Sequence, residues 1–199
     1  IKAAVKFKLG KDELTGVKVA VQGLGSVGYS LCEKLHQAGA ELIVTDINQA
    51  ALDKAATELN AKVVGLDEIY SQDVDVFSPC ALGGVLNDDT IPLLNCPIVA
   101  GSSNNVLKEE RHGEGLKKRG ILYSPDFVIN AGGLINVYHE LNGYNETRAL
   151  AEVKLIFDRL LDIFKIAKEE DIPVNIAAIK FAEKRIETMK QVRSNYIPR

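Results

Sequence analysis

A glycine-rich segment between an apolar run and an amphipathic run most constrains the fold of this chain. Residues 17–21, Val-Lys-Val-Ala-Val, alternate and are largely β-branched, which predicts a buried strand. Gly23, Gly25 and Gly28 follow at G-x-G-x-x-G spacing. Apolar residues then recur every three or four positions until Gly39, which predicts a helix. A strand joined to a helix by such a turn is typical of the first unit of a parallel α/β sheet.

The same alternation continues for about a hundred residues. Further strands are predicted at 42–44, 62–64, 74–77, 97–100 and 121–123, and helices at 49–59 (capped by Asn48), 106–119 and, less regularly, 87–94. Parallel strands need crossover connections, so the pattern predicts an α/β fold, a Rossmann-type doubly wound parallel sheet with helices on both faces. Beyond it, helical spacing interrupted at Pro173 predicts a C-terminal helical tail.

Composition excludes several classes of function. The chain is 46% hydrophobic and 26% charged with a net charge of −3, so neither nucleic acid nor an acidic membrane is an expected partner. Cys32, Cys80 and Cys96 lie far apart without a CxxC pair, which predicts no disulfide framework and no metal site, and fits a reducing cytoplasm. The first residue is Ile1 and the single methionine is Met189, so we expect a piece of a longer protein.

The glycine turn and an acid downstream predict a dinucleotide site. Gly23 permits the tight turn, Gly25 allows the backbone to approach phosphates, and Gly28 lets helix and strand pack closely. The helix start offers free N–H groups and partial positive charge to a diphosphate. Asp46 ends the second strand, where its carboxylate can accept hydrogen bonds from the adenosine ribose and repel a 2′-phosphate, so NAD is favoured over NADP. The alternatives are a plain tight turn and an Asp46 that only caps the next helix.

Six segments in order resemble one family. They are 21–29 (VQGLGSVGY), 45–48 (TDIN), 78–84 (SPCALGG), 100–105 (AGSSNN), 128–137 (VINAGGLINV) and the tail around 182–193. Together they are similar to the cofactor half of the glutamate/leucine/phenylalanine/valine amino-acid dehydrogenase family, with the leucine type closest. The resemblance implies NAD-dependent oxidative deamination of a branched-chain or aromatic L-amino acid to the 2-oxo acid and ammonia.

The resemblance also implies roles for individual residues. Cofactor contacts are expected from Gly23, Leu24, Gly25, Ser26, Val27, Gly28, Tyr29, Asp46, Ile47, Cys80, Ala81, Leu82, Asn105 and Asn130. The substrate pocket is expected to include Asn130, Leu134 and Val137, whose apolar members favour aliphatic or aromatic side chains over glutamate. Asn130 could instead be a helix cap only, and Leu134 and Val137 could be core residues.

The family's catalytic lysines and aspartate have no counterpart in this chain, because they belong to its N-terminal domain. We therefore expect residues 1–14 to be the end of an inter-domain helix and a linker, 15–149 the NAD-binding domain, and 150–199 helices that pack toward that N-terminal domain. The expected partners are the amino acid or 2-oxo acid, the N-terminal domain and further copies in a homo-oligomer. The chain alone should bind NAD without turnover. Two alternatives are a stand-alone NAD-binding regulatory module and a domain for another nucleotide or flavin.

Overall fold

The computed structural model describes residues 1–141 and 143–194, with side chains as far as residue 191. The elements are α1 (Lys2–Leu9), β1 (Lys18–Gln22), α2 (Ser26–Gln37), β2 (Glu41–Thr45), α3 (Gln49–Leu59), β3 (Lys62–Val63), η1 (Glu68–Ser71), β4 (Val76–Pro79), η2 (Ile91–Leu93), β5 (Ile98–Val99), α4 (His112–Lys118), β6 (Leu122–Tyr123), α5 (Asp126–Ile129), α6 (Gly132–Leu141), α7 (Glu146–Glu169) and α8 (Val174–Ser194). Here η marks a 3₁₀ helix. The expected tail included 195–199, which lie outside the described residues.

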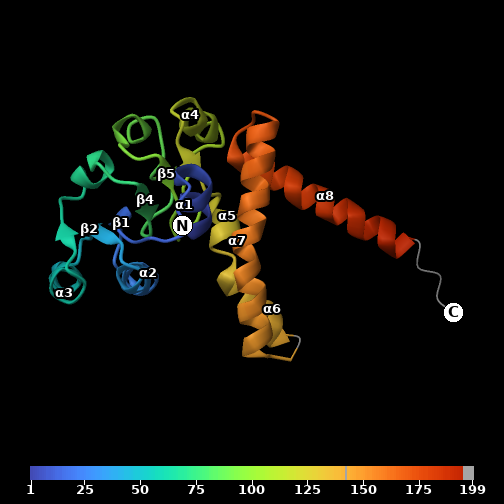
Figure 1. Ribbon diagram of the computed structural model, residues 1–199, viewed down its shortest axis with the longest axis horizontal. Helices are drawn as coiled ribbons and strands as arrows, with labels where there is room; N and C mark the ends of the chain where they lie inside the picture. Colours follow the sequence, from blue (N-terminus) through green and yellow to red (C-terminus); the bar gives the residue numbers. More distant parts are fainter. Residues whose placement is uncertain (142, 195–199) are drawn as a thin grey trace.

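The strands form one six-stranded sheet in the order β3-β2-β1-β4-β5-β6, and every pair is parallel. The order reverses between β1 and β4, so the chain winds outward from the centre in both directions (Figure 1). This confirms the doubly wound α/β fold. The strands predicted at 62–64 and 97–100 are shorter than expected, at two residues each.

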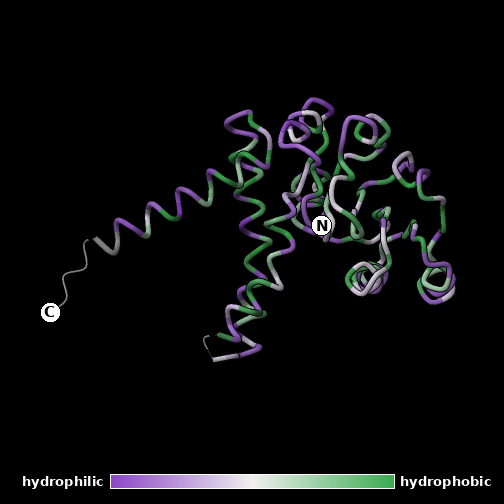
Figure 2. Tube along the Cα trace, turned by 180° about the vertical axis from the view of Figure 1, so that it is seen from behind, coloured by the Kyte–Doolittle hydropathy of each residue, from purple (hydrophilic) through white to green (hydrophobic). Residues whose placement is uncertain are grey.

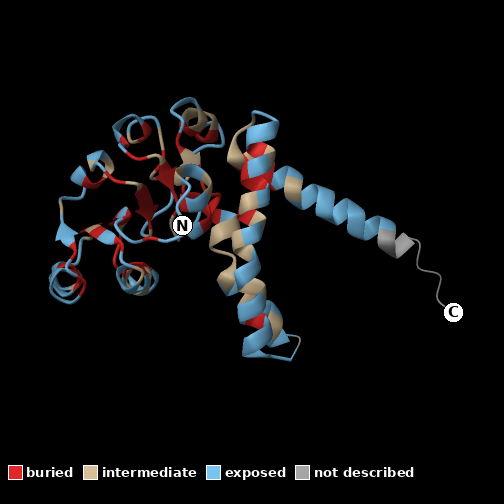
Figure 3. Ribbon diagram, viewed as in Figure 1, coloured by how far each residue is buried: buried red, intermediate tan, exposed pale blue. Residues whose placement is uncertain are grey.

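Side chains alternate along the central strands and divide the interior into two layers. Val19 and Val21 of β1 face the layer formed with α1, α2, α3 and α7, whereas Ala20 faces the layer formed with η1, η2 and α4. The buried residues gather on both sides of the sheet in Figure 3. Such double burial explains why these strands are nearly continuous apolar runs in the sequence.

The N-terminal helix α1 packs against the sheet and against α7. In α1, Ala3, Ala4 and Val5 are buried in the same core as the sheet. The rings of Phe7 and Phe164 lie 5.3 Å apart, which joins α1 to α7. Residues 1–9, expected to end an inter-domain helix, therefore contribute to this core. Helix α8 instead leaves the body at an angle to α7 (Figures 1 and 2).

The helix predicted at 106–119 is wrong in its first half. Helix α4 covers only His112–Lys118. Before it, Leu107 forms a parallel bridge with Leu86, and Leu86 donates to the carbonyl of Val106 at 3.0 Å. The apolar spacing was helical, but these side chains face a neighbouring loop that sequence periodicity does not include. The short helix α5 was not predicted.

All three cysteines are free. Burial raises the pKa of Cys32 to about 12 and that of Cys96 to about 11, so both stay protonated thiols at neutral pH. Among the described residues, no helix combines the length and apolar character that a membrane crossing requires.

The packing of α7 leads to a stability prediction. Phe164 is 1% exposed and Leu155, on the same helix, is 46% exposed. We expect Phe164→Ala to lower the free energy of unfolding by about 3–5 kcal/mol, because it removes a buried ring and leaves a cavity. The matched control Leu155→Ala should cost less than about 1 kcal/mol. Urea unfolding measures both, and equal losses would contradict the assignment of α7 to the sheet core.

Candidate functional site

The carboxyl ends of three adjacent strands lie at one level. The register pairs Gln22 of β1 with Thr45 of β2 on one side and with Pro79 of β4 on the other. The next residues therefore emerge together at the place where the strand order reverses. In open α/β sheets, this is where ligands bind.

The turn after β1 is closely packed. Gly23 has φ 102°, which favours glycine, and a Cβ there would lie 2.7 Å from the Cβ of Ala81. A Cβ on Gly28 would lie only 2.1 Å from the carbonyl oxygen of Gly23. The first and third glycines thus allow α2 to begin directly above β1, with the loop after β4 against the turn.

The second glycine has a different environment. Gly25 is exposed, and a Cβ there would meet no atom within 4 Å. It is the N-cap of α2, and no side chain caps that end of the helix. The space over Gly25 is therefore open to a ligand, and the N–H groups of the first turn of α2 can attract an anion.

Asp46 connects the second strand to this turn. Its Oδ2 accepts from the N–H of Leu24 at 2.5 Å, and its Oδ1 accepts from the N–H of Asn48 at 2.8 Å. Asn48 is the residue that caps α3, since its side chain accepts from Ala50 and Ala51 at 3.0 and 3.3 Å. The reading of Asp46 as a helix cap only is therefore wrong, because its carboxylate faces the glycine turn.

Exposed apolar side chains surround the turn. Val27 is 63% exposed, Ile47 90% and Leu82 75%. Next to them, the hydroxyl of Tyr29 donates to Glu58 at 2.7 Å and joins α2 to α3. Partial burial and this hydrogen bond raise the pKa of Tyr29 to about 12. These apolar surfaces can pack against the flat faces of a bound ligand.

Loops after β4, β5 and β6 continue the site in one row. A Cβ on Gly83 would lie 2.7 Å from the carbonyl oxygen of Asn104, so these two loops touch. The Nδ2 group of Asn130 donates to the Oδ1 of Asn104 at 2.5 Å. Asn105, at φ 51°, accepts from the N–H of Gly84 at 2.7 Å through its carbonyl. Amide side chains thus line the far half of the row.

The predicted residues occupy this edge in two groups. The first group lies around the end of β1. It consists of the residues of the glycine turn, of Asp46 and Ile47, and of Cys80 to Leu82. The side chain of Asn130 bonds to Asn104, a residue to which sequence analysis assigned no role. Asn130 is the C-cap of α5, and its side chain makes the hydrogen bond to Asn104. Leu134 and Val137 are 74% and 50% exposed on α6, so they do not belong to the core that the described residues form.

One cluster of possible metal ligands lies elsewhere. Asp88, Glu109 and His112 offer atoms within 4.8 Å of one another. Arg111 binds both carboxylates, at 2.5 Å to Asp88 and 2.9 Å to Glu109, and holds their pKa values below the usual range. The Nδ1 atom of His112 accepts from the N–H of Glu109, so a neutral ring carries its proton on Nε2. In the described structure, Arg111 and these two carboxylates therefore form an ion-pair network.

Sequence and structure comparisons agree on one family. Over residues 43–191 the sequence matches the family described as Glutamate/Leucine/Phenylalanine/Valine dehydrogenase. It is 53% identical over 197 residues to leucine dehydrogenase from Thermoactinomyces intermedius, covering 99% of this chain and 54% of that protein. The chain thus spans about half the length of the curated relatives that it matches.

Solved structures extend the likeness to three dimensions. L-tryptophan dehydrogenase from Nostoc punctiforme superposes with a TM-score of 0.94 at 51% identity, over 96% of this chain and 57% of that one. The hetero-hexameric glutamate dehydrogenase from Thermus thermophilus has a TM-score of 0.72 at 20% identity, over 98% of this chain and 52% of that one. The second comparison indicates a shared fold alone.

The turn geometry predicts that two glycine substitutions differ in their effect on stability. Gly28→Ala should lower the free energy of unfolding by about 1–3 kcal/mol, because its methyl group would overlap the Gly23 carbonyl. Gly25→Ala should lower it by less than about 1 kcal/mol, because the new methyl group enters open space and only the N-cap preference for glycine is lost. Thermal and urea unfolding test the pair. A Gly25→Ala variant as unstable as Gly28→Ala would refute the described turn.

Proposed function

The chain belongs to the Glutamate/Leucine/Phenylalanine/Valine dehydrogenase family, and on that premise we propose that it is the NAD-binding part of a leucine-type L-amino-acid dehydrogenase. The whole protein would oxidatively deaminate a branched-chain or aromatic L-amino acid to the 2-oxo acid and ammonia. Relatives that carry the names leucine and L-tryptophan dehydrogenase support this substrate class.

One observation carries the cofactor proposal, namely the contact between the Asp46 carboxylate and the Leu24 N–H. It places an acid next to a helix N-terminus whose approach is open over Gly25. A diphosphate at that helix start would have its adjoining ribose within reach of Asp46, since each carboxylate oxygen retains a lone pair. The residues present therefore fit a dinucleotide. The exposed side chains of Val27 and Ile47 would cover its adenine.

The site favours NAD over NADP. A 2′-phosphate would lie beside the Asp46 carboxylate and be repelled by it. Neither neighbour compensates, because Ile47 is apolar and the side-chain oxygen of Asn48 is engaged in capping α3.

The nicotinamide half would extend away from Asp46. Because the adenosine half lies at the end of β2, the other half crosses the turn toward the loops after β4, β5 and β6. There Cys80, Ala81 and Leu82 would line its path, and Asn105 and Asn130 would bind its amide end or the substrate carboxylate. When bound, NAD supplies a hydride acceptor for the α-carbon of the amino acid.

The substrate side chain would contact α6. Leu134 and Val137 lie three residues apart on one face of that helix and are largely exposed. They would form an apolar wall that favours leucine, valine, isoleucine or phenylalanine over glutamate. The lysine that activates water, the second lysine that binds the substrate carboxylate and the aspartate for proton transfer are expected in the part of the relatives that this chain does not match.

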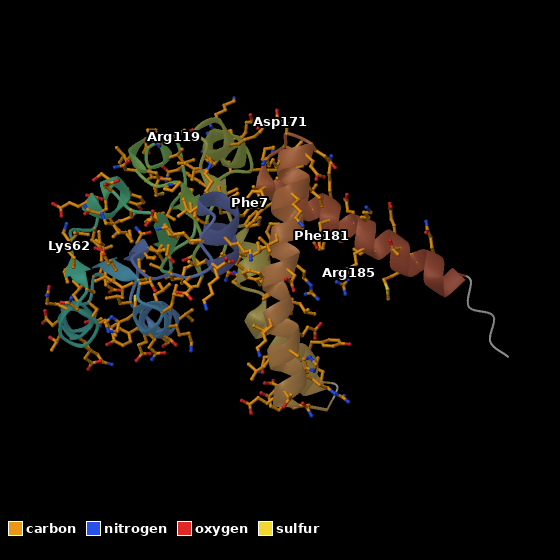
Figure 4. The ribbon with its side chains drawn as sticks, viewed as in Figure 1. Phe7, Lys62, Arg119, Asp171, Phe181 and Arg185 are labelled. Atoms are coloured by element: carbon orange, nitrogen blue, oxygen red, sulfur yellow. The ribbon has the colours of Figure 1, made fainter. Side chains whose placement is uncertain are left out.

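The C-terminal helices would pack on that remaining part of the protein. The groove between α5, α7 and α8 contains Ile156 and Phe181 with Arg159 and Arg185. Figure 4 shows Phe181 and Arg185 in the angle between α7 and α8. On α8, Ile186 and Met189 are 55% and 54% exposed, which favours burial against another domain.

We also propose that the whole protein is a cytoplasmic homo-oligomer.

Cofactor selectivity gives the first functional prediction. The chain should bind NADH at least about tenfold more tightly than NADPH, and Asp46→Ser should remove most of that preference by removing the negative charge. Asp53→Ser is the matched control, because Asp53 is an exposed acid on α3 whose carboxylate accepts from Gln49 and, among the described residues, makes no hydrogen bond to the glycine turn. Fluorescence titration measures the affinities of the wild-type chain and of both variants for NADH and NADPH. Failure of the wild-type chain to bind NADH, or preference for NADPH, would exclude the proposal.

The second functional prediction concerns turnover by the chain alone. The 199-residue chain should bind NADH yet reduce no NAD in the presence of L-leucine or L-phenylalanine, because hydride transfer requires a substrate held in close geometry. Absorbance of NADH follows the reaction, with a complete leucine dehydrogenase as positive control. Measurable deamination by the chain alone would show that it contains the catalytic groups.

A further inference from the structure

A buried carboxylate lies behind the amide-lined half of the site. Asp126 is the first residue of α5 and is 8% exposed. Its Oδ2 accepts from the N–H of Val106 at 2.8 Å, and its Oδ1 accepts from the N–H of Phe127 at 2.8 Å. A buried carboxylate is costly unless hydrogen bonds satisfy it, so these bonds hold the loop after β5 against the start of α5.

Asp126 is hydrogen-bonded to the segments that carry both members of the amide pair. The carbonyl of Asp126 accepts from the N–H of Asn130 at 2.9 Å, which sets the turn of α5 that ends at Asn130. Its carboxylate holds Val106, two residues beyond Asn104. The hydrogen bond from Asn130 to Asn104 therefore joins two segments that the Asp126 carboxylate also connects.

The loop is also fixed from its other side. The carbonyls of Asn105 and Val106 accept from the N–H groups of Gly84 and Leu86 at 2.7 and 3.0 Å. These bonds tie the loop to the segment after β4 and not to α5. The link to α5 is made by the bond from the Val106 N–H to Asp126 at its start and by the bond from Asn130 to Asn104 at its end.

We propose that Asp126 is a positioning residue for the nicotinamide half of the cofactor. The inference rests on the proposed NAD site, in which the adenosine half lies by Asp46 and the other half extends toward Asn104 and Asn130. Asp126 touches neither half. It acts by setting the spacing of the two amides that the nicotinamide end would meet.

The test compares two ligands that differ at the nicotinamide end. ADP-ribose keeps the adenosine, diphosphate and second ribose of NADH but lacks the nicotinamide. In Asp126→Asn, an amide NH₂ would face one of two backbone N–H donors, so one hydrogen bond is lost. Calorimetric titration of the 199-residue chain should give NADH binding at least about tenfold weaker. ADP-ribose binding should stay within about twofold. Asp126→Ser, whose hydroxyl can still accept from Phe127 but cannot reach Val106, should weaken NADH binding and spare ADP-ribose binding in the same way as Asp126→Asn.

Two controls make the result specific. Asp75→Asn removes a similar bridging carboxylate, whose Oδ2 accepts from the N–H of Lys18 at 2.9 Å. This bond lies at the amino end of β1, away from the site. It should leave the ratio of the two affinities unchanged. Asn104→Ala should change the ratio in the same direction as Asp126→Asn, and the double variant should lose less than the sum of both effects.

The outcomes separate the two proposals. A wild-type chain that binds neither ligand would overturn the NAD site and this inference with it. A wild-type chain that binds both, together with an unchanged ratio in the Asp126 variants, would overturn the inference alone. Variants of Asp126 that unfold or lose both ligands equally would also overturn it, because Asp126 would then be a residue of stability only.

Discussion

The close approach of Gly28 to the carbonyl of Gly23 is the contact on which the rest of the site depends. A single methyl group there would lie 2.1 Å from the oxygen, so only glycine lets α2 start directly above the end of β1. This brings the positive end of the helix to the place where the strand order reverses. Asp46 then joins the turn to β2 by one short hydrogen bond, and the loop after β4 fits against Gly23.

The remaining half of the site is built differently. No single turn creates it, because it is a row of loops that hold one another. Gly83 contacts the carbonyl of Asn104, and the amides of Asn104 and Asn130 bond to each other. A buried carboxylate behind them connects the two segments. The near half is therefore set by local geometry and the far half by contacts between distant residues.

Prediction from the sequence succeeded where short-range rules apply. The strand, the glycine turn, the first helix and the cap at Asn48 are all determined by neighbours within about one turn of helix, and the structure has each of them. It failed at residues 106–111, where helical spacing is present but the side chains pack on Leu86 and its loop. It also missed Asp126, although an acid after a proline at a strand end is a visible signal.

The sequence by itself determined the α/β alternation, the turn at residues 23–28 and the acid that ends the second strand, because each depends on backbone preference and burial within a short segment. The tertiary structure decided which asparagine side chains form a hydrogen bond with each other. Asn104 rather than Asn105 pairs with Asn130, and Asp126 lies behind them, because loops that follow different strands are brought together only by the order of those strands in the sheet. Their contacts span 20 residues or more along the chain, a distance over which hydrophobic periodicity carries no information.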